Sequence, residues 1–117
     1  MKNTLVKILI IVITIGLAIT GKAQTQANEL PPGYYVVVGA YAESREDAAK
    51  RFVAKLNKNG HHAAYGYNSV RSLYFVYLDY FTALKPALRN MQGVRAKGQF
   101  IDAWVRVVPG DINKEAA

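Results

Sequence analysis

The sequence predicts a single α+β domain of the split βαβ type, in which strands and helices follow in the order β-α-β-β-α-β. Two observations carry this prediction. An aromatic and β-branched run, YYVVVGAY at 34–41, has a near-copy in YFVYLDYF at 74–81, and each run precedes a stretch with helical spacing of apolar residues. The chain has 117 residues, which is enough for one small domain at most. We therefore expect a four-stranded antiparallel sheet with two helices on one face.

The first half of the domain reads as strand, helix, strand. Residues 34–41 alternate with the period of a strand. Ser44 and Asp47 have the spacing of a capping box at the start of a helix, and Gly60 can end that helix in a left-handed conformation. Residues 61–68 predict a weaker strand. Between the two strands, apolar residues recur at helical spacing at Ala48, Ala49, Phe52, Val53 and Leu56.

The second half repeats that order. Residues 72–81 predict a strong strand, 83–92 a short helix, and 98–108 a last strand that Pro109-Gly110 ends. Pro86 lies within the first turn of the predicted helix, where proline is tolerated. The usual strand order for this fold, 4-1-3-2, puts the two similar strands side by side at the centre. The tail at 109–117 is polar and we expect it to be loose.

The N-terminal 23 residues have the layout of a secretory signal peptide. Lys2 and Lys7 precede an uncharged apolar run at 8–21, and small residues occupy the −3 and −1 positions of a cleavage site after Ala23. The alternative is an uncleaved membrane anchor, although 14 residues are short for a span, which needs about 20. We expect cleavage, a periplasmic location, and a short linker at 24–33 before the domain.

Charge and cysteine content narrow the functional classes. Removal of the signal peptide lowers the formal net charge from +7 to +4, because residues 1–23 hold three lysines and no acid. A modestly basic exported protein suits an anionic surface such as a cell-wall polymer, lipid headgroups or an acidic partner. The absence of cysteine excludes a disulfide framework, a thiolate metal site and a cysteine nucleophile.

Strand alternation divides each strong strand into a helix-facing side and an open side. The more aliphatic sets are expected to face the helices: Tyr34, Val36, Val38 and Ala40; Tyr74, Val76, Leu78 and Tyr80; Ile101, Ala103, Val105 and Val107. The opposite sets are expected on the open face: Tyr35, Val37, Gly39 and Tyr41; Phe75, Tyr77, Asp79 and Phe81; Asp102, Trp104 and Arg106.

That open face would carry more aromatic surface than a soluble domain usually leaves uncovered. Flat rings beside hydrogen-bonding groups suit sugar rings or nucleobases as ligands. Two interpretations stay open. Either the face binds a ligand, or the tail, the linker or a second copy of the chain covers it.

Other residue clusters do not favour catalysis, a metal or a cofactor. His61 and His62 are adjacent on a predicted strand and point to opposite faces, so they cannot grip one ion. Asp79 and Asp102 are expected at opposite ends of the sheet, farther apart than the paired carboxylates of a glycosidase. The sequence lacks the RNA-recognition motif, and export leads away from RNA. We expect no enzyme activity, no metal or cofactor, and no nucleic-acid partner.

Over residues 34–108 the chain resembles the SPOR domain family. Its first half, YYVVVGAYAESREDAAKRFVAKLNKNGHHAAY, closely follows the family pattern Y-x-V-x-V-G-x-[FY] and the capped helix after it. SLYFVYLDYF stands where the second half of the family reads like L-Y-R-V-x-V-G-P-F, and DAWV resembles a closing strand. Val37 stands where many members have glutamine, and Ala40, Asp79 and Tyr80 replace a serine, a glycine and a proline. The polar part of the family's face is thinner here and the aromatic part is richer.

This resemblance implies a bacterial cell-envelope module that binds peptidoglycan without catalysis, with a preference for glycan strands stripped of their stem peptides. The rings of Tyr35, Phe75, Tyr77 and Trp104 would stack on sugars. Gly39 would admit a ring close to the backbone, and Arg106 would pair with a carboxylate of the wall. The alternative is an adaptor that docks another envelope protein through the same face. The membrane is a partner only if the signal segment stays uncleaved. The expected ligand-binding residues are Tyr35, Val37, Gly39, Phe75, Tyr77, Trp104 and Arg106.

Overall fold

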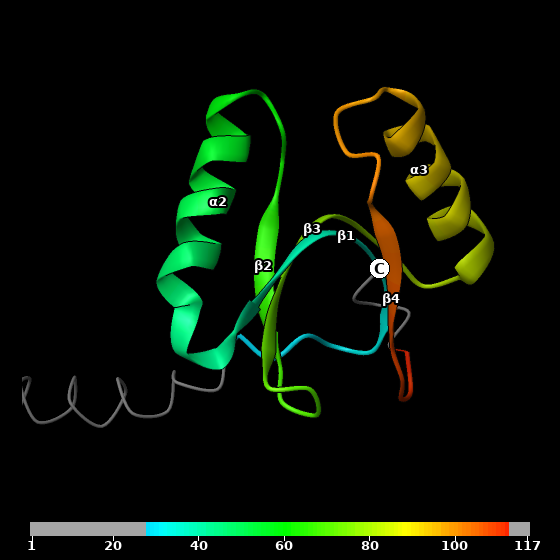
Figure 1. Ribbon diagram of the computed structural model, residues 1–117. Coiled ribbons are helices and arrows are strands. Elements are labelled where there is room, and N and C mark those ends of the chain that lie inside the picture. Colours follow the sequence, from blue (N-terminus) through cyan, green and yellow to red (C-terminus); the bar gives the residue numbers. More distant parts are fainter. Residues whose placement is uncertain (1–27, 113–117) are drawn as a thin grey trace, which may run out of the picture.

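The computed structural model describes residues 28–112, which form a four-stranded antiparallel sheet with the strand order β2-β3-β1-β4 (Figure 1). This is the expected fold class, and β1 and β3, the two similar strands, are neighbours at the centre. The expected signal peptide or membrane anchor lies outside the described residues. The elements are β1 Gly33–Ala42, a 3-10 turn Glu43–Arg45, α2 Glu46–Lys58, β2 Ala64–Asn68, β3 Leu73–Phe81, α3 Leu84–Ala96 and β4 Trp104–Val108.

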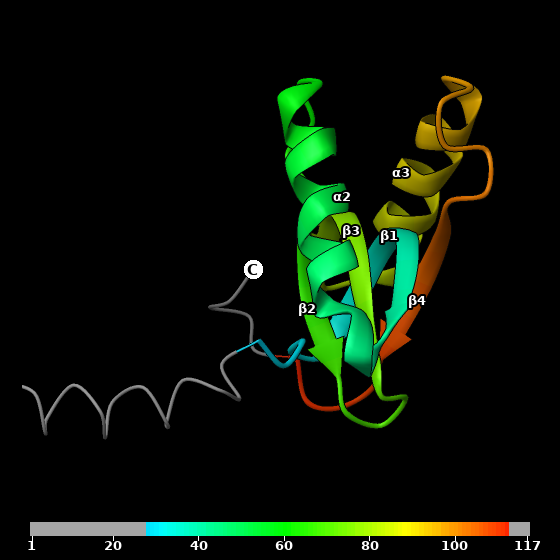
Figure 2. The same cartoon turned by 60° about the vertical axis from the view of Figure 1, so that its left-hand side comes forward.

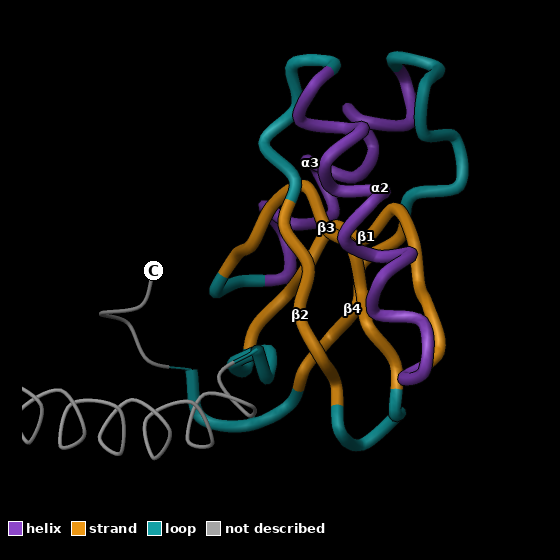
Figure 3. The backbone as a smooth tube through the Cα atoms, turned by 90° about the vertical axis from the view of Figure 1, so that its left-hand side faces the viewer, coloured by secondary structure: helices purple, strands orange, loops and turns teal. Residues whose placement is uncertain are grey.

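Both helices pack on the same face of the sheet (Figure 2). Helix α2 buries Ala49 and Leu56 against Val76 of β3, whereas α3 buries Met91 against Val36 of β1. The loops that follow the two helices, 59–63 and 97–103, lie at the same end of the molecule (Figures 1 and 3). The two βαβ halves therefore have matching positions in space as well as in sequence. Neither helix in the range 28–112 is long and apolar enough to cross a membrane.

The ends of the helices differ from the expectations in two places. The Ser44–Asp47 capping box is wrong, because Ser44 lies in the 3-10 turn and no side chain caps α2, whose N-cap is Arg45. Gly60 does close α2, with a φ of 94° and a hydrogen bond from its backbone N–H to the carbonyl oxygen of Asn57. Helix α3 extends four residues past the expected end at residue 92. Pro86 is its third residue, where a backbone N–H has no partner within the helix.

The last strand is shorter than expected, since it begins at Trp104 rather than at residue 98. The preceding residues turn instead of extending. Gly98 has a φ of 83°, and the backbone N–H of Ala103 donates to the carbonyl oxygen of Phe100 at 3.2 Å. Arg95 of α3 holds this turn, because its Nε donates to the carbonyl oxygen of Ala103 at 2.6 Å.

Each central strand contains one extra residue, which is a β-bulge. Val36 pairs with Asp79 and Val37 pairs with Tyr77, so Leu78 of β3 has no opposite residue. Gly39 then pairs with Val76, so Val38 of β1 has none either. Val38 and Leu78 hold equivalent positions in the two similar sequence runs, and the duplication therefore includes the bulges.

The bulges reverse the alternation of side chains beyond them. Gly39 and Tyr41, expected on the open face, instead lie toward α2, where Tyr41 packs edge-on against Phe52 with ring centroids 6.3 Å apart. Asp79 and Phe81 likewise lie toward α3 rather than on the open face. The carboxylate of Asp79 accepts a hydrogen bond from the side-chain amide of Asn90 in α3 at 3.0 Å, and Phe81 packs against the cluster of Met91.

The same reversal moves two residues in the other direction. Tyr80 and Ala40, expected in the helix-facing core, lie on the open side of the sheet. The ring of Tyr80 is 4.9 Å from that of Tyr35, and Ala40 is exposed opposite Phe75. The expected faces are confirmed for the residues that precede the bulge in each strand. Val36, for example, packs under α3 as expected.

Residues 28–32 pack on the open side of the sheet, and we call them the N-terminal strap (Figure 1). A parallel bridge joins Glu29 to Tyr67 of β2, with Leu30 N–H donating to Tyr67 O at 2.8 Å and Tyr67 N–H donating to Asn28 O at 2.7 Å. Leu30 is only 5% exposed and sits over Gly66, where an added Cβ would lie 2.3 Å from its Cδ2 atom. Gly66 is therefore required by the close approach of the strap.

We expect Leu30→Ala to lower the free energy of unfolding by about 2–5 kcal/mol, because it empties a buried site between the strap and the sheet. Urea unfolding, followed by the fluorescence of Trp104, measures this change. Val70→Ala is the matched control, since Val70 is 88% exposed and its truncation changes stability by less than about 0.5 kcal/mol. Equal stabilities of the two variants would contradict the packing of the strap.

Candidate functional site

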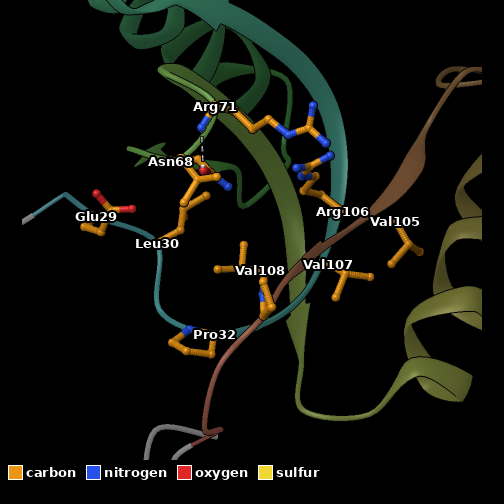
Figure 4. Close-up of a pocket in the computed structure, with 11 residues that line it drawn as sticks. Glu29, Leu30, Pro32, Asn68, Arg71, Val105, Arg106, Val107 and Val108 are labelled. Atoms are coloured by element: carbon orange, nitrogen blue, oxygen red, sulfur yellow. Dashed lines mark hydrogen bonds between the residues drawn. The ribbon is translucent and has the colours of Figure 1, made fainter.

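A groove of about 680 Å³ crosses the open side of the sheet (Figure 4). It lies between the strap, the turn that joins β2 to β3, and strand β4. The strap contributes Leu30, the turn contributes Asn68 and Arg71, and β4 contributes Arg106 and Val108. The site therefore combines apolar walls with amide and guanidinium groups, a composition typical of pockets for polar ligands.

Three of the expected ligand-binding side chains lie beneath this surface rather than on it. Tyr35 is 1% exposed, Val37 0% and Phe75 3%, and all three pack against Leu30 of the strap. The hydroxyl of Tyr35 donates to the carbonyl oxygen of Pro31 at 2.5 Å. The interpretation that a linker segment covers the open face thus holds for these residues, which form the floor on which the groove is built.

Tyr77 and Trp104 remain partly exposed on the same side of the sheet. The ring of Tyr77 meets that of Tyr35 edge to face, with centroids 4.9 Å apart and planes at 75°. Trp104 pairs with Val37 across β4 and β1, two residues from Arg106 on the same side of the strand. Gly39 does not join them, because an added Cβ there would point at Phe52 of α2.

Burial also affects the ionisation of the floor. It raises the pKa of the Tyr35 hydroxyl well above its ordinary value of 10.0, with smaller contributions from the neighbouring Tyr77 and Tyr80. Burial also raises the pKa of Tyr77. Both hydroxyls are therefore neutral hydrogen-bonding groups at physiological pH.

Two arginines from separate elements reach the groove. Arg106 is opposite Tyr35 in the register of β4 and β1, and its guanidinium carbon lies 5.4 Å from the centroid of the Phe75 ring. Its Nε is buried and lacks an acceptor among the described residues. Arg71 lies in the β2–β3 turn, where its backbone N–H donates to the side-chain oxygen of Asn68 at 3.1 Å.

Sequence reasoning had missed Asn68, Arg71 and the strap as parts of the site. The sequence contains only weak local signals for these residues. Asn68 is of a residue type that favours turns and precedes the polar stretch between two strands. Leu30 is the one large apolar residue of the segment 24–30 and stands directly before two prolines. Gly39 carried a signal for the bulge, since an isolated glycine in a strand pattern often marks one.

The described residues contain no cluster of three or more histidines, aspartates or glutamates that could hold a metal ion. His61 packs edge-on against Phe100, with ring centroids 5.2 Å apart. On the far side of α2 Asp47 accepts a hydrogen bond from Arg51 at 2.8 Å, and this bond lowers the pKa of its carboxyl group.

The sequence matches the family model of the SPOR domain over residues 30–107, which is two thirds of the chain. The chain belongs to the SPOR domain family, and the family is known for peptidoglycan binding. Searches of curated proteins and of solved structures find no match. The matched range begins at Leu30, so it includes most of the strap as well as the four strands except Val108, the last residue of β4.

Because burial raises the pKa of the Tyr35 hydroxyl, we expect its ionisation at alkaline pH to destabilise the fold. Its folded-state pKa is raised, so its contribution is fully present below about pH 10, its ordinary pKa, and is lost as the pH rises further. We expect the free energy of unfolding, measured by urea unfolding, to fall as the pH rises above about 10. In Tyr35→Phe this fall should be smaller than in the parent protein.

Tyr34→Phe, the neighbour on the other side of β1, is the matched control for removal of a tyrosine hydroxyl. The same pH dependence in both variants and in the parent protein would contradict a special role for Tyr35.

Proposed function

We propose that this chain binds the glycan strands of peptidoglycan, without catalysis, in the groove on the open side of its sheet. The observation that carries the proposal is the groove itself, in a chain that belongs to a peptidoglycan-binding family. A groove bounded by the strap on one side and β4 on the other suits an extended polymer. Its guanidinium and amide groups suit the hydroxyl, amide and carboxylate groups of such a polymer.

The roles of the expected residues divide according to their exposure. Trp104 and Tyr77 do not line the groove, but they are partly exposed on the same side of the sheet, so their rings can stack on sugar rings of a strand that extends past the groove. Tyr35, Val37 and Phe75 support these rings from below. Arg106 supplies hydrogen-bond donors at the wall of the groove. Gly39 has no place in this arrangement, since it lies toward α2.

Non-catalytic binding is favoured by the positions of the acids. Asp79 is turned to α3 by its hydrogen bond with Asn90, and Asp102 lies in the turn before β4. Glu29 is the one carboxylate among the described residues that line the groove, and its oxygen accepts a hydrogen bond from the backbone N–H of Ser69 at 3.1 Å. A glycosidase needs two carboxylates on either side of the scissile bond.

Binding of peptidoglycan agrees with a location in the periplasm, and SPOR domains are found in envelope proteins. Docking of another envelope protein through the aromatic face is the other function considered. A flat aromatic platform would favour it, but the strap covers Tyr35 and Phe75 and leaves a groove instead. The groove favours the polysaccharide.

We expect Trp104→Ala to reduce binding to purified peptidoglycan sacculi about tenfold, because tryptophan is often a binding hot spot and Trp104 lies beside the groove, next to Val105 of its lining. Co-sedimentation of residues 24–117, the protein after the expected cleavage, measures the bound fraction across a range of sacculus concentrations. Leu88→Ala is the matched control. Leu88 is 37% exposed on α3, on the other side of the sheet.

Sedimentation of the parent protein should saturate and should survive in Leu88→Ala. A parent protein that stays in the supernatant at all sacculus concentrations would contradict glycan binding and would direct the search to a protein partner.

A further inference from the structure

Two guanidinium groups face one part of the groove without a carboxylate between them. Figure 4 shows the side chains of Arg71 and Arg106 directed toward the same region, while Glu29 lies on the far side, in the strap. The ion pairs found among residues 28–112 join Asp47 to Arg45 and Arg51 on the helix side, so neither groove arginine is neutralised in this way.

The Arg106 side chain is held by packing, and the backbone of Arg71 is held by a turn. Arg106 extends over the Phe75 ring, with a cation–π distance of 5.4 Å, and Phe75 is itself 3% exposed. Arg71 lies in a turn that is fixed by the buried side chain of Asn68. The guanidinium groups are therefore supplied by a β-strand and a fixed turn, not by a free tail.

The buried Nε of Arg106 lacks an acceptor among the described residues. An unpaired buried donor is unfavourable, and two cations directed at one region repel each other. A bound oxyanion would offset the repulsion between the two cations, because a carboxylate can accept two parallel hydrogen bonds from the outer nitrogens of a guanidinium group.

We propose that Arg71 and Arg106 form a carboxylate subsite within the groove. The proposal rests on the proposed glycan binding and deepens it by naming the group that is recognised. Peptidoglycan offers two sources of carboxylate: the lactyl group of muramic acid, which is free where the stem peptide has been removed, and the stem peptide itself. A neutral N-acetylglucosamine polymer has the same sugar rings and neither carboxylate.

The test compares three oligosaccharides of equal length in titrations monitored by Trp104 fluorescence. They are chitotetraose, a muramic acid tetrasaccharide with free lactyl groups, and the same tetrasaccharide with stem peptides attached. The parent protein should bind at least one acidic tetrasaccharide more tightly than chitotetraose. Arg71→Gln should weaken that binding by roughly tenfold, the usual effect of losing one charge-assisted hydrogen bond, and should weaken chitotetraose binding by a clearly smaller factor.

Arg106→Gln should have the same selective effect, and Arg106→Lys should restore part of it, since the charge returns without the planar fork. Arg89→Gln removes the same charge from the outer side of α3 and should change nothing. The tetrasaccharide that loses affinity in Arg71→Gln identifies the source of the carboxylate.

Three results separate the possible failures. Unchanged acidic binding in both glutamine variants would overturn the subsite while leaving glycan binding intact. Equal loss of chitotetraose and acidic binding would show that the arginines only support the groove, which also overturns it. Arg71 decides this point because it is exposed and outside the core. A parent protein that binds none of the three would refute the proposed function itself.

Discussion

In the central pair of strands, Val38 of β1 and Leu78 of β3 are accommodated as extra residues, and the positions of the side chains that follow depend on them. Without these bulges Tyr80 would point at the helices, and Asp79 would stand among the aromatic rings of the open side. With them, Asp79 reaches Asn90 and the Tyr80 hydroxyl donates to the carbonyl oxygen of Pro32 at 2.7 Å. The bulges thus supply part of the surface on which the strap packs.

The element order, the strand order and the helix-covered face follow from the sequence, because the repeated run and the helical periodicity are strong local signals. Side-chain direction beyond residues 38 and 78 does not follow, since alternation with period two assumes an unbroken ladder. The error affected three pairs of equivalent residues: Gly39 with Asp79, Ala40 with Tyr80, and Tyr41 with Phe81. The same error occurs in both halves because each half contains a bulge at the equivalent position.

The candidate site was only partly accessible to sequence reasoning. Aromatic residues on the open side were correctly placed at Tyr35, Phe75, Tyr77 and Trp104, but their exposure depends on a segment that has no periodicity of its own. The strap is positioned by hydrogen bonds to Tyr67 and by the missing side chain of Gly66, which are contacts across 36 or more residues of chain. Local patterns hold no information about such contacts.

The bridge between the strap and β2 also has a consequence for self-association. Open sheets can polymerise when both edge strands are free, because each added copy presents a new edge. Here Asn28 and Leu30 occupy the outer hydrogen-bonding groups of Tyr67, which interrupts the five-residue edge of β2. Among the described residues β4 then presents the longer uninterrupted edge. Two copies joined edge to edge through β4 would leave only the interrupted β2 edges outside, so the strap disfavours further growth of the sheet.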